Sequence, residues 1–388
     1  MNFDLIVVGA GLAGASFARA ARGFSTALIA PERRTAAPAP VSGGFDARVY
    51  ALSPANAEFL RDLKVWQGIA PERLTPVHAM RVYGDDGRSL IEFDAYQAGV
   101  DALAWIVEDG VLQDALRRSL ETRDGLEILA PAQCERLESS AEGATVHLRG
   151  GRSLHGKLVV GADGAHSFVR EATGLGATER AYGQTAVVAN FACERPHGNV
   201  AQQWFQGGPV LALLPLPGSH VSMVWSLADA EAARVLALDV DALCREVEQA
   251  SHGTHGVLTL VTPARGFALR RLAARRLVVP RVALIGDAAH VVHPLAGQGA
   301  NLGLQDARAL AQILAACEPV RDPGDLRLLR RYARSRAEGI LAMDATVHGL
   351  YRLFAARGRA VSLLRNAGLN LTDRVPVLKN ILMRQAMG

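Results

Sequence analysis

The sequence predicts an α/β fold in which a βαβ-type domain with a parallel sheet is interrupted by an inserted mixed or antiparallel sheet, followed by a helical C-terminus. Three observations predict it. The chain opens with an apolar run, a glycine-rich turn and a helical segment, and a second apolar run follows at 26–30. Apolar runs return at 158–160 and 277–285, whereas residues 181–262 have the texture of paired strands. The first domain is therefore expected to be discontinuous in sequence.

The individual elements are predicted from local pattern. Residues 3–8 are apolar without alternation, as in a strand buried on both faces, and residues 13–22 are rich in alanine, a strong helix former. Further helices are expected at 51–65, 108–122, 302–316 and 325–356, a β-meander over 126–160, and hairpins from 77–84 with 88–94 and from 210–216 with 221–227.

These elements divide the chain into three parts. The predicted nucleotide-binding domain comprises residues 1–75, 100–180 and 265–325. The predicted substrate-binding sheet domain comprises residues 76–99 and 181–264, and a C-terminal helical region comprises residues 326–388.

Composition narrows the class of protein. The chain has 388 residues, 49% hydrophobic and 21% charged, which is ordinary for a globular enzyme. Its net charge of +4 is too small to indicate nucleic-acid binding. The four cysteines are far apart without a C-x-x-C pair, so we expect neither a metal site nor a disulfide framework. No unbroken apolar run reaches the roughly 18 residues of a spanning helix, and the first residues read as a strand, so a cytoplasmic location is expected.

The first motif is the glycine-rich turn after the first strand. Gly9, Gly11 and Gly14 form G-x-G-x-x-G, in which the glycines allow a tight turn, close approach of the backbone to a pyrophosphate, and packing of helix on strand. This predicts a Rossmann-like unit. The acid expected at the end of the second strand falls at Ala30, so Glu32 either binds the ribose from two residues later or is a solvated loop carboxylate.

Two further strand-to-turn motifs follow. Residues 158–171 read as a strand, then Gly-Ala-Asp-Gly with Asp163 and Gly164, then a helix. Residues 282–304 read as a strand, then Asp287 in a glycine-rich turn, then a helix from about 301. An Asp in such a turn can accept hydrogen bonds from sugar hydroxyls, and a helix start offers free N–H groups and a partial positive charge.

The order of these motifs resembles the flavin aromatic hydroxylases of the 4-hydroxybenzoate hydroxylase-like class, and more closely the ubiquinone-biosynthesis polyprenylphenol hydroxylases. The resemblance extends over roughly residues 4–355. Besides the three motifs it rests on FDARVYALS (45–53), VLQ (111–113), YGQTA (182–186), GP (208–209) with LLPL (213–216), VW (224–225) and HPLAGQGAN (293–301).

The resemblance implies a Rossmann-like FAD-binding domain and roles for its residues. Gly9, Gly11 and Gly14 would hold the FAD pyrophosphate, and Asp287 the ribityl chain or phosphate side. The other implied cofactor contacts are Arg48 and Gln113 on the flavin nucleotide, Asp163 and Gly164 in a motif shared by FAD and NAD(P)H, and Gly297, Gly299, Ala300 and Asn301 as backbone donors to the pyrimidine edge. Pro294 would cap the flavin face as a candidate catalytic residue, and His293 would contact the phenol. Read as isolated residues, each also fits a structural role such as a turn proline, a packing histidine, a capping Asp or a surface ion pair.

The resemblance also implies a reaction. NAD(P)H reduces FAD, O₂ adds to form a C4a-hydroperoxide, and an electron-rich phenol takes one oxygen atom. Trp204, Phe205, Leu213, Leu214 and Trp225 are expected to line the substrate side. A small acidic substrate would call for Arg and Tyr in the sheet over 181–226, which holds only a loop arginine there, so a prenylated phenol is favoured.

Other interpretations remain open from sequence. The protein could hydroxylate a small soluble aromatic, reduce a prenyl group without consuming O₂, or act as a non-catalytic flavin- or prenyl-binding scaffold. Residues 352–388 carry seven Lys or Arg and one Asp among apolar residues, which suits a membrane surface, a ubiquinone-biosynthesis complex or a subunit interface. The oligomeric state is left open, and a peripheral location at the inner membrane is an additional expectation.

Overall fold

The first sheet is formed by apolar runs from separate parts of the chain. The computed structural model describes residues 1–32, 44–86, 89–292, 298–318 and 321–355. Every adjacent pair of strands from β18 through β11, β1 and β2 to β8 is parallel, which confirms the predicted discontinuous parallel sheet. The strand order is β17 (Val278–Val279), β18 (Val282–Leu284), β11 (Ser153–Gly161), β1 (Asn2–Val8), β2 (Thr26–Ile29) and β8 (Leu126–Leu129), with β10 (Ala144–Leu148) and β9 (Cys134–Ser139) added beside β11.

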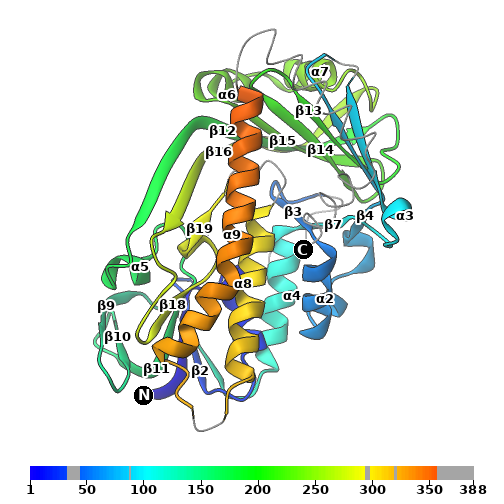
Figure 1. The fold of residues 1–388 in the computed structure, drawn as a ribbon. Coiled ribbons are helices and arrows are strands. Elements are labelled where there is room, and N and C mark those ends of the chain that lie inside the picture. The colour runs from blue at the N-terminus through cyan, green and yellow to red at the C-terminus, as the bar shows by residue number, and fades with distance from the viewer. Residues whose placement is uncertain (33–43, 87–88, 293–297, 319–320, 356–388) are drawn as a thin grey trace.

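Alternate residues of β1 enter two different cores. Leu5 and Val7 pack on the side covered by helices, whereas Ile6 and Val8 pack on the other side, near β10 and α5. This division follows from the two-residue period of a strand. The helical layer consists of α1 (Leu12–Ala20), α4 (Asp109–Glu121), α8 (Gln298–Ala315) and α9 (Leu326–Ala355). Within it α8 lies between α1 and α9, and Figure 1 shows α8 and α9 side by side.

The meander predicted over 126–160 is only partly correct. Strands β9, β10 and β11 are successive antiparallel neighbours, as predicted. β8, in contrast, pairs in parallel with β2 at the far edge of the sheet. It follows α4, and a strand reached through a crossover helix joins its sheet in parallel.

The second sheet is mixed and carries the two longest strands. Its order is β19 (His290–Val291), β16 (Leu258–Ala274), β12 (Ala177–Cys193), β15 (His220–Ala228), β14 (Val210–Leu216), β13 (Val200–Phe205), β5 (Ala79–Tyr83) and β6 (Leu90–Asp94). All of its neighbouring strands are antiparallel except β13 and β5, which are parallel. Both predicted hairpins are confirmed, as β5 with β6 and as β14 with β15.

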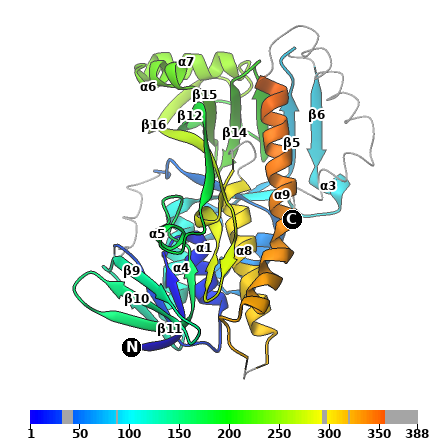
Figure 2. The ribbon, with the colours of Figure 1, turned by 60° about the vertical axis from the view of Figure 1, so that its left-hand side comes forward.

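Two helices lie within the region predicted to hold only paired strands. They are α6 (Asp229–Leu236) and α7 (Val240–Ala250), and Figure 2 shows both across the end of the second sheet away from β9 and β10. The signal for α7 was present in the sequence. Asp239 accepts a hydrogen bond from the Ala242 N–H at 2.7 Å as an N-cap, and Leu243 and Val247 follow at helical spacing. The paired strands predicted over 181–262 are present, and the two helices among them were not predicted.

Shorter elements join the two large sheets. A three-stranded sheet has the order β3 (Val49–Leu52), β7 (Ala104–Glu108) and β4 (Thr75–Val77). The helix expected at 51–65 begins only at Pro54, because the preceding residues pair with β7. The other short elements are α2 (Pro54–Asp62), η2 (Trp66–Gly68), η3 (Pro71–Arg73), α3 (Ala95–Ala98), α5 (Phe168–Ala172) and η4 (Gly286–Ala288).

The long strands β12 and β16 connect the two ends of the molecule. Figure 1 shows them running from the second sheet down toward α5 and β19, next to the first sheet.

Among the described residues, no helix is both long and apolar enough to cross a bilayer. The predicted domain boundaries stay a prediction.

Candidate functional site

The first glycine turn is closed on one side and open on the other. Gly9 has φ +107°, and a Cβ there would overlap the carbonyl oxygen of Ala162. A Cβ on Gly14 would overlap the carbonyl oxygen of Gly9. Gly11 is different, since it is exposed and no atom lies within 4 Å of the place its Cβ would take. Of the three glycines in this turn, Gly11 is therefore the one that presents bare backbone to open space.

The start of α1 has the donors that a phosphate needs. No side chain caps this helix, and its first turn holds no acidic residue. The first N–H groups of a helix have no intrahelical acceptor and carry a partial positive charge. Uncapped donors beside an open glycine suit a pyrophosphate. The residues present therefore fit the phosphate-bearing part of FAD, the cofactor implied by the sequence.

The three predicted motif turns contact one another. A Cβ on Gly14 would lie 2.9 Å from the Cβ of Ala162, next to the second motif. A Cβ on Gly286, in the third motif, would lie 2.9 Å from the Cβ of Ala13. Segments more than a hundred residues apart in sequence thus pack against one another at the ends of β1, β11 and β18.

The carboxylate of Asp163 faces its own helix. Its Oδ1 accepts from the Ser167 hydroxyl and its Oδ2 from the Val169 N–H at 3.1 Å, so it caps the start of α5. Burial raises the pKa of Asp163, and the hydrogen bonds from Ser167 and Val169 act against this. Gly164 follows with φ +82°, a value glycine adopts without strain. The geometry gives Asp163 a turn-shaping task, and its contact with a cofactor stays a prediction.

Arg170 ties the second motif to the third and was missed from sequence. Its guanidinium is buried and donates to the carbonyl oxygens of Ala165 at 2.7 Å and of Ala288 at 2.9 Å. A buried guanidinium that bridges two loops through backbone carbonyls holds them at a set distance. Its place one turn into a helix after Asp-Gly was the only available signal.

Asp287 projects from the third turn among positive charges. Gly286, with φ +60°, allows the sharp turn that follows β18. Asp287 is exposed on one side, but the surrounding protein partly desolvates its carboxylate and so raises its pKa. The positive charges of Arg48, His290 and Arg270 act in the opposite direction and lower this pKa. An exposed carboxylate beside these cations is placed to accept hydrogen bonds from ligand hydroxyls.

Asp109 gathers two of the predicted cofactor residues. Its Oδ1 accepts from the Tyr50 hydroxyl at 2.8 Å and from Gln113 Nε2 at 3.2 Å. The guanidinium of Arg48 lies 5.2 Å from the centre of the Tyr50 ring, and the Asp109 N–H donates to the Arg48 carbonyl oxygen. Arg48 and Gln113 are therefore brought together, and Asp109, which sequence reasoning missed, connects them. Burial is the main reason that the pKa of Tyr50 is raised.

A buried ion pair supports the segment that carries Arg48. Glu108 is 1% exposed and its Oε2 accepts from Arg73 at 2.6 Å and from the Asp46 N–H at 2.8 Å. Burial raises the pKa of Glu108. Asp46 in turn accepts from the Gly110 N–H at 2.6 Å, at the start of α4. These contacts fix the backbone two residues before Arg48.

The start of α8 is anchored by Asn301. Its buried side chain accepts from the Ser53 N–H at 3.0 Å and from Asn56 Nδ2 at 2.9 Å, and it donates to the Ala51 carbonyl oxygen at 2.9 Å. The Asn301 side chain is therefore occupied by contacts with β3 and the start of α2. Its predicted contact with the flavin is through the backbone N–H groups at the start of α8. Gly299 and Ala300 lie half-buried in the first turn of α8. His293, Pro294 and Gly297 lie outside the described residues.

The structure describes both Ala30, where an acidic residue that binds the ribose was expected, and Glu32, which was considered in its place. Ala30 is 5% exposed, and its N–H donates to the Leu129 carbonyl oxygen while its own carbonyl accepts from the Ala132 N–H. Glu32 is exposed and is the last described residue before the segment 33–43. A role for Glu32 in ribose binding stays a prediction.

The faces of the second sheet correct part of the predicted substrate lining. Trp204, Leu213 and Trp225 are buried in the core that α6 and α7 cover, not on the opposite face. The cause is the two-residue period, because Leu211 and Leu213 share a face whereas Leu214 points the other way. Phe205 lies on the same face as Leu214. We call this the inner face, since its Asn190 donates to the Asp46 carbonyl oxygen at 2.8 Å.

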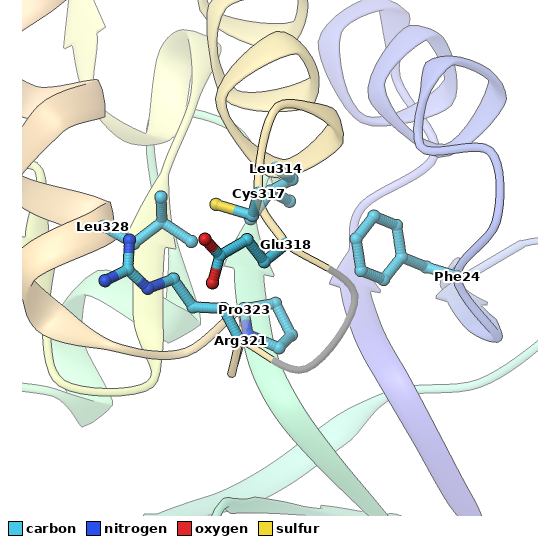
Figure 3. Close-up of a pocket in the computed structure, with 7 residues that line it drawn as sticks. All are labelled: Phe24, Leu314, Cys317, Glu318, Arg321, Pro323 and Leu328. Carbon is cyan, nitrogen blue, oxygen red and sulfur yellow. The ribbon is translucent and has the colours of Figure 1, made fainter.

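A small pocket lies at the other end of the helical layer. Figure 3 shows it between the end of α8, the residues that follow this helix and Phe24. Its lining residues are Phe24, Leu314, Cys317, Glu318, Arg321, Pro323 and Leu328. An 18-residue helix is about 27 Å long, so this pocket is distant from the motif turns at the start of α8.

Comparison with known proteins agrees with this geometry. Residues 2–344 match the family described as FAD binding domain. The chain is 34% identical to ubiquinone hydroxylase UbiL of Rhodospirillum rubrum over 99% of this chain and 89% of that protein. It is 30% identical to 3-demethoxyubiquinol 3-hydroxylase of Escherichia coli over 99% of this chain and 98% of that protein.

The fold is also found among solved structures. That of PqsL from Pseudomonas aeruginosa, a probable FAD-dependent monooxygenase, superposes with a TM-score of 0.79 at 24% identity, covering 95% of this chain and 99% of that one. Together with the matches in sequence, the three converging motif turns identify the relationship. The chain belongs to the FAD-binding domain family and, within it, to the FAD-dependent monooxygenases of ubiquinone biosynthesis.

Proposed function

We propose that this protein hydroxylates the ring of a polyprenylated phenol, a precursor of ubiquinone, with bound FAD, NAD(P)H as reductant and O₂ as oxidant. The observation that carries the proposal is the convergence of the three motif turns, in which Ala162 packs on Gly9 and Gly14 and Ala13 packs on Gly286. The relatives named ubiquinone hydroxylase and 3-demethoxyubiquinol 3-hydroxylase match almost the whole chain, which supports the same substrate class.

The chain's own residues would bind and orient the cofactor. The backbone at Gly11 and the start of α1 would hold the pyrophosphate, and Asp287 would accept from hydroxyls of the ribityl chain. Arg48 and Gln113, held by Asp109, would contact the nucleotide, and the start of α8 would place N–H groups at the flavin ring. Reduced FAD supplies the chemistry that activates O₂ and transfers one oxygen atom. The helix start would stabilise negative charge on that ring.

The inner face of the second sheet suits an apolar substrate. Between Pro196 and Ala228 the chain contains no Asp, Glu, Lys or Arg. Ala212 and Leu214 of β14 and Val224 of β15 are half-buried on this face, where apolar side chains remain available for contact. Such a surface would exclude water and pack on a prenyl chain, whereas a carboxylate substrate would find no cation among these strands.

The first experiment is a visible spectrum of the purified protein, followed by O₂ consumption with NADPH and a short-chain prenylphenol. We expect a flavin spectrum, O₂ uptake that the prenylphenol stimulates, and a hydroxylated product. A phenolic acid without a prenyl chain is the matched control and should stimulate little uptake. Equal hydroxylation of both compounds would indicate that the substrate is a small soluble aromatic and not a prenylphenol. Reoxidation of the NADPH-reduced flavin by the prenylphenol without O₂ uptake would indicate a reductase. A folded protein that FAD cannot reconstitute would indicate a non-catalytic scaffold.

We also propose that the enzyme meets its substrate at a membrane surface. A polyprenylated phenol partitions into lipid, and residues 352–388, outside the described residues except for 352–355, carry seven basic residues against one Asp. Sedimentation with vesicles containing anionic lipid tests this. Binding that falls with salt is expected, and no difference between anionic and neutral vesicles would contradict the proposal.

A further inference from the structure

A fully buried carboxylate lies directly behind the third motif turn. Asp306 of α8 is 0% exposed, and its Oδ2 accepts from the Gly286 N–H at 2.9 Å and from His290 Nε2 at 2.6 Å. Its Oδ1 accepts from Arg336 Nε of α9 at 2.7 Å. We call Asp306, His290 and Arg336 the Asp306 network.

The arrangement of the network is specific. His290 and Arg336 are 4% and 8% exposed, so three ionisable side chains are buried together. A buried ion cluster is weak evidence of added stability, since its replacement by well-packed apolar side chains is often neutral or stabilising. Each contact of Asp306 reaches a different element, namely η4, β19 and α9, while Asp306 itself belongs to α8.

Two of the elements that Asp306 joins, η4 and α8, are those that would face the flavin. The Gly286 N–H is one residue before Asp287, and α8 begins eight residues before Asp306. The turn and the helix are packed backbone to backbone, because a Cβ on Gly303 would lie 3.4 Å from the Gly286 Cα. A carboxylate that bonds the turn from within the helix therefore sets the position of Asp287 relative to the helix start.

Charge around Asp287 depends on the same network. His290 is among the cations whose charge acts on Asp287, together with Arg48 and Arg270. Arg336 pairs with Asp306 and also donates to Gln305 Oε1 at 3.1 Å, so α9 holds the carboxylate from the side away from the turn. Loss of Arg336 would remove a positive charge beside the Asp306 carboxylate and leave the hydrogen bond from the Gly286 N–H to Asp306 in place.

We propose that Asp306 is a positioning residue of the FAD site, which holds the Gly286–Asp287 turn against the start of α8, and that Arg336 of α9 keeps its carboxylate in place. The inference rests on FAD binding at the three motif turns and not on the identity of the substrate. It makes helix α9 a determinant of cofactor affinity, because Arg336 acts on the Gly286–Asp287 turn through Asp306.

The test measures FAD affinity and thermal unfolding of the full-length apoprotein for Asp306→Asn, Arg336→Met and Arg336→Lys. Because hydrogen bonds to charged groups are lost, Asp306→Asn and Arg336→Met should each raise the Kd for FAD by about tenfold. The shift in Tm that saturating FAD produces should shrink accordingly. Arg336→Lys keeps a cation at this position and should restore most of the affinity.

Arg123→Met is the matched control. Arg123 is also a buried arginine, but its guanidinium donates to the carbonyl oxygens of Ala21 and Phe24, after α1, away from the motif turns. We expect this variant to lower the Tm of the apoprotein and leave the Kd for FAD within about twofold. If Asp306→Asn and Arg336→Met behave in the same way, with the Kd unchanged, the network serves only the core and the proposal is wrong.

A second variant decides the matter if Asp306→Asn does not fold. His290→Asn keeps the pair of Asp306 and Arg336 and removes one cation near Asp287. A raised Kd for FAD together with a more negative midpoint potential of the bound flavin is expected, and an unchanged Kd and potential would contradict the proposal. Since neither measurement involves a substrate, failure of the hydroxylation assay leaves this result interpretable.

Discussion

The hydroxyl of Tyr50 donates a 2.8 Å hydrogen bond to the carboxylate of Asp109. Tyr50 lies on β3 and Asp109 at the start of α4, so this bond joins the strand that follows Arg48 to the helix that carries Gln113. Two residues that the sequence singled out separately are thus oriented by a third that it did not.

Replacing Asp109 by Ala should therefore disturb both partners at once. We expect the Kd for FAD to rise by about three- to tenfold, because the Tyr50 and Gln113 hydrogen bonds are lost together. Fluorescence titration of the apoprotein with FAD measures it. Asp114→Ala on the same helix is the control, since Asp114 pairs with Arg117 and Arg118 of its own helix near the surface. An equal effect of both substitutions would show that Asp109 has no special part in cofactor binding.

The glycines of the first turn should separate folding from binding. At Gly11 the backbone is extended, with φ −72° and ψ −175°, and an added Cβ meets no protein atom within 4 Å. Gly11→Ala should leave the Tm of the apoprotein within about 2 °C but reduce FAD affinity at least tenfold, because the methyl group occupies the space of the pyrophosphate.

Gly14→Ala should fail differently. Its Cβ would overlap the Gly9 carbonyl oxygen and press on Ala162, so the helix cannot pack on the strand and the apoprotein itself loses stability. Circular-dichroism melting of both variants without FAD tests the contrast. Equal destabilisation by the two substitutions would contradict the view that only Gly11 faces the ligand.

Stability should depend on pH through the Asp306 network. Burial works to lower the pKa of His290, but Asp306 outweighs it and the pKa is raised above 6.5. The contribution of His290 is thus complete below about pH 6.5 and is lost as pH rises through its folded pKa. Burial works to raise the pKa of Asp306, but His290 and Arg336 outweigh it and the pKa is lowered. The contribution of Asp306 is therefore complete above its unfolded pKa of about 3.9 and is lost as pH falls through the lowered folded pKa.

The measurement is the free energy of unfolding by urea from pH 6 to pH 9 for the unaltered protein and His290→Asn. The difference between the two proteins should decrease as pH rises, because the charged imidazole that distinguishes them loses its proton. A difference that stays constant over this range would mean that His290 does not change its charge there.

Adjacent leucines on β14 should affect different properties. Leu213 is 0% exposed in the core under α6 and α7, so Leu213→Ala should cost about 2–5 kcal/mol of stability and leave the KM for a prenylphenol nearly unchanged. Leu214 is half-buried on the inner face, and Leu214→Ala should raise the KM several-fold with a smaller loss of stability. Steady-state kinetics with urea unfolding measures both. A raised KM for Leu213→Ala with an unchanged KM for Leu214→Ala would instead place the substrate on the face that α6 and α7 cover.

Short-range pattern predicted the parts of the structure that depend on neighbours in sequence. The strand at residues 2–8, the helix after Gly11 and the hairpin of β14 and β15 all follow from apolar periodicity and turn residues. Pattern failed at β8, whose parallel pairing with β2 depends on the route taken by α4, and at α7, where the cap at Asp239 was overlooked.

The sequence by itself determined the three glycine-containing turns, the parallel strands that lead into them and the family to which the chain is related, because each depends on residues close together in the chain. Only the tertiary structure decided how these turns are held. Asp306 reaches Gly286 and Arg336, Arg170 reaches Ala288, and Asp109 reaches Tyr50, through contacts that no local pattern encodes. The physical reason is that buried polar groups must find partners wherever the packed chain brings them, so their roles are set by neighbours distant in sequence.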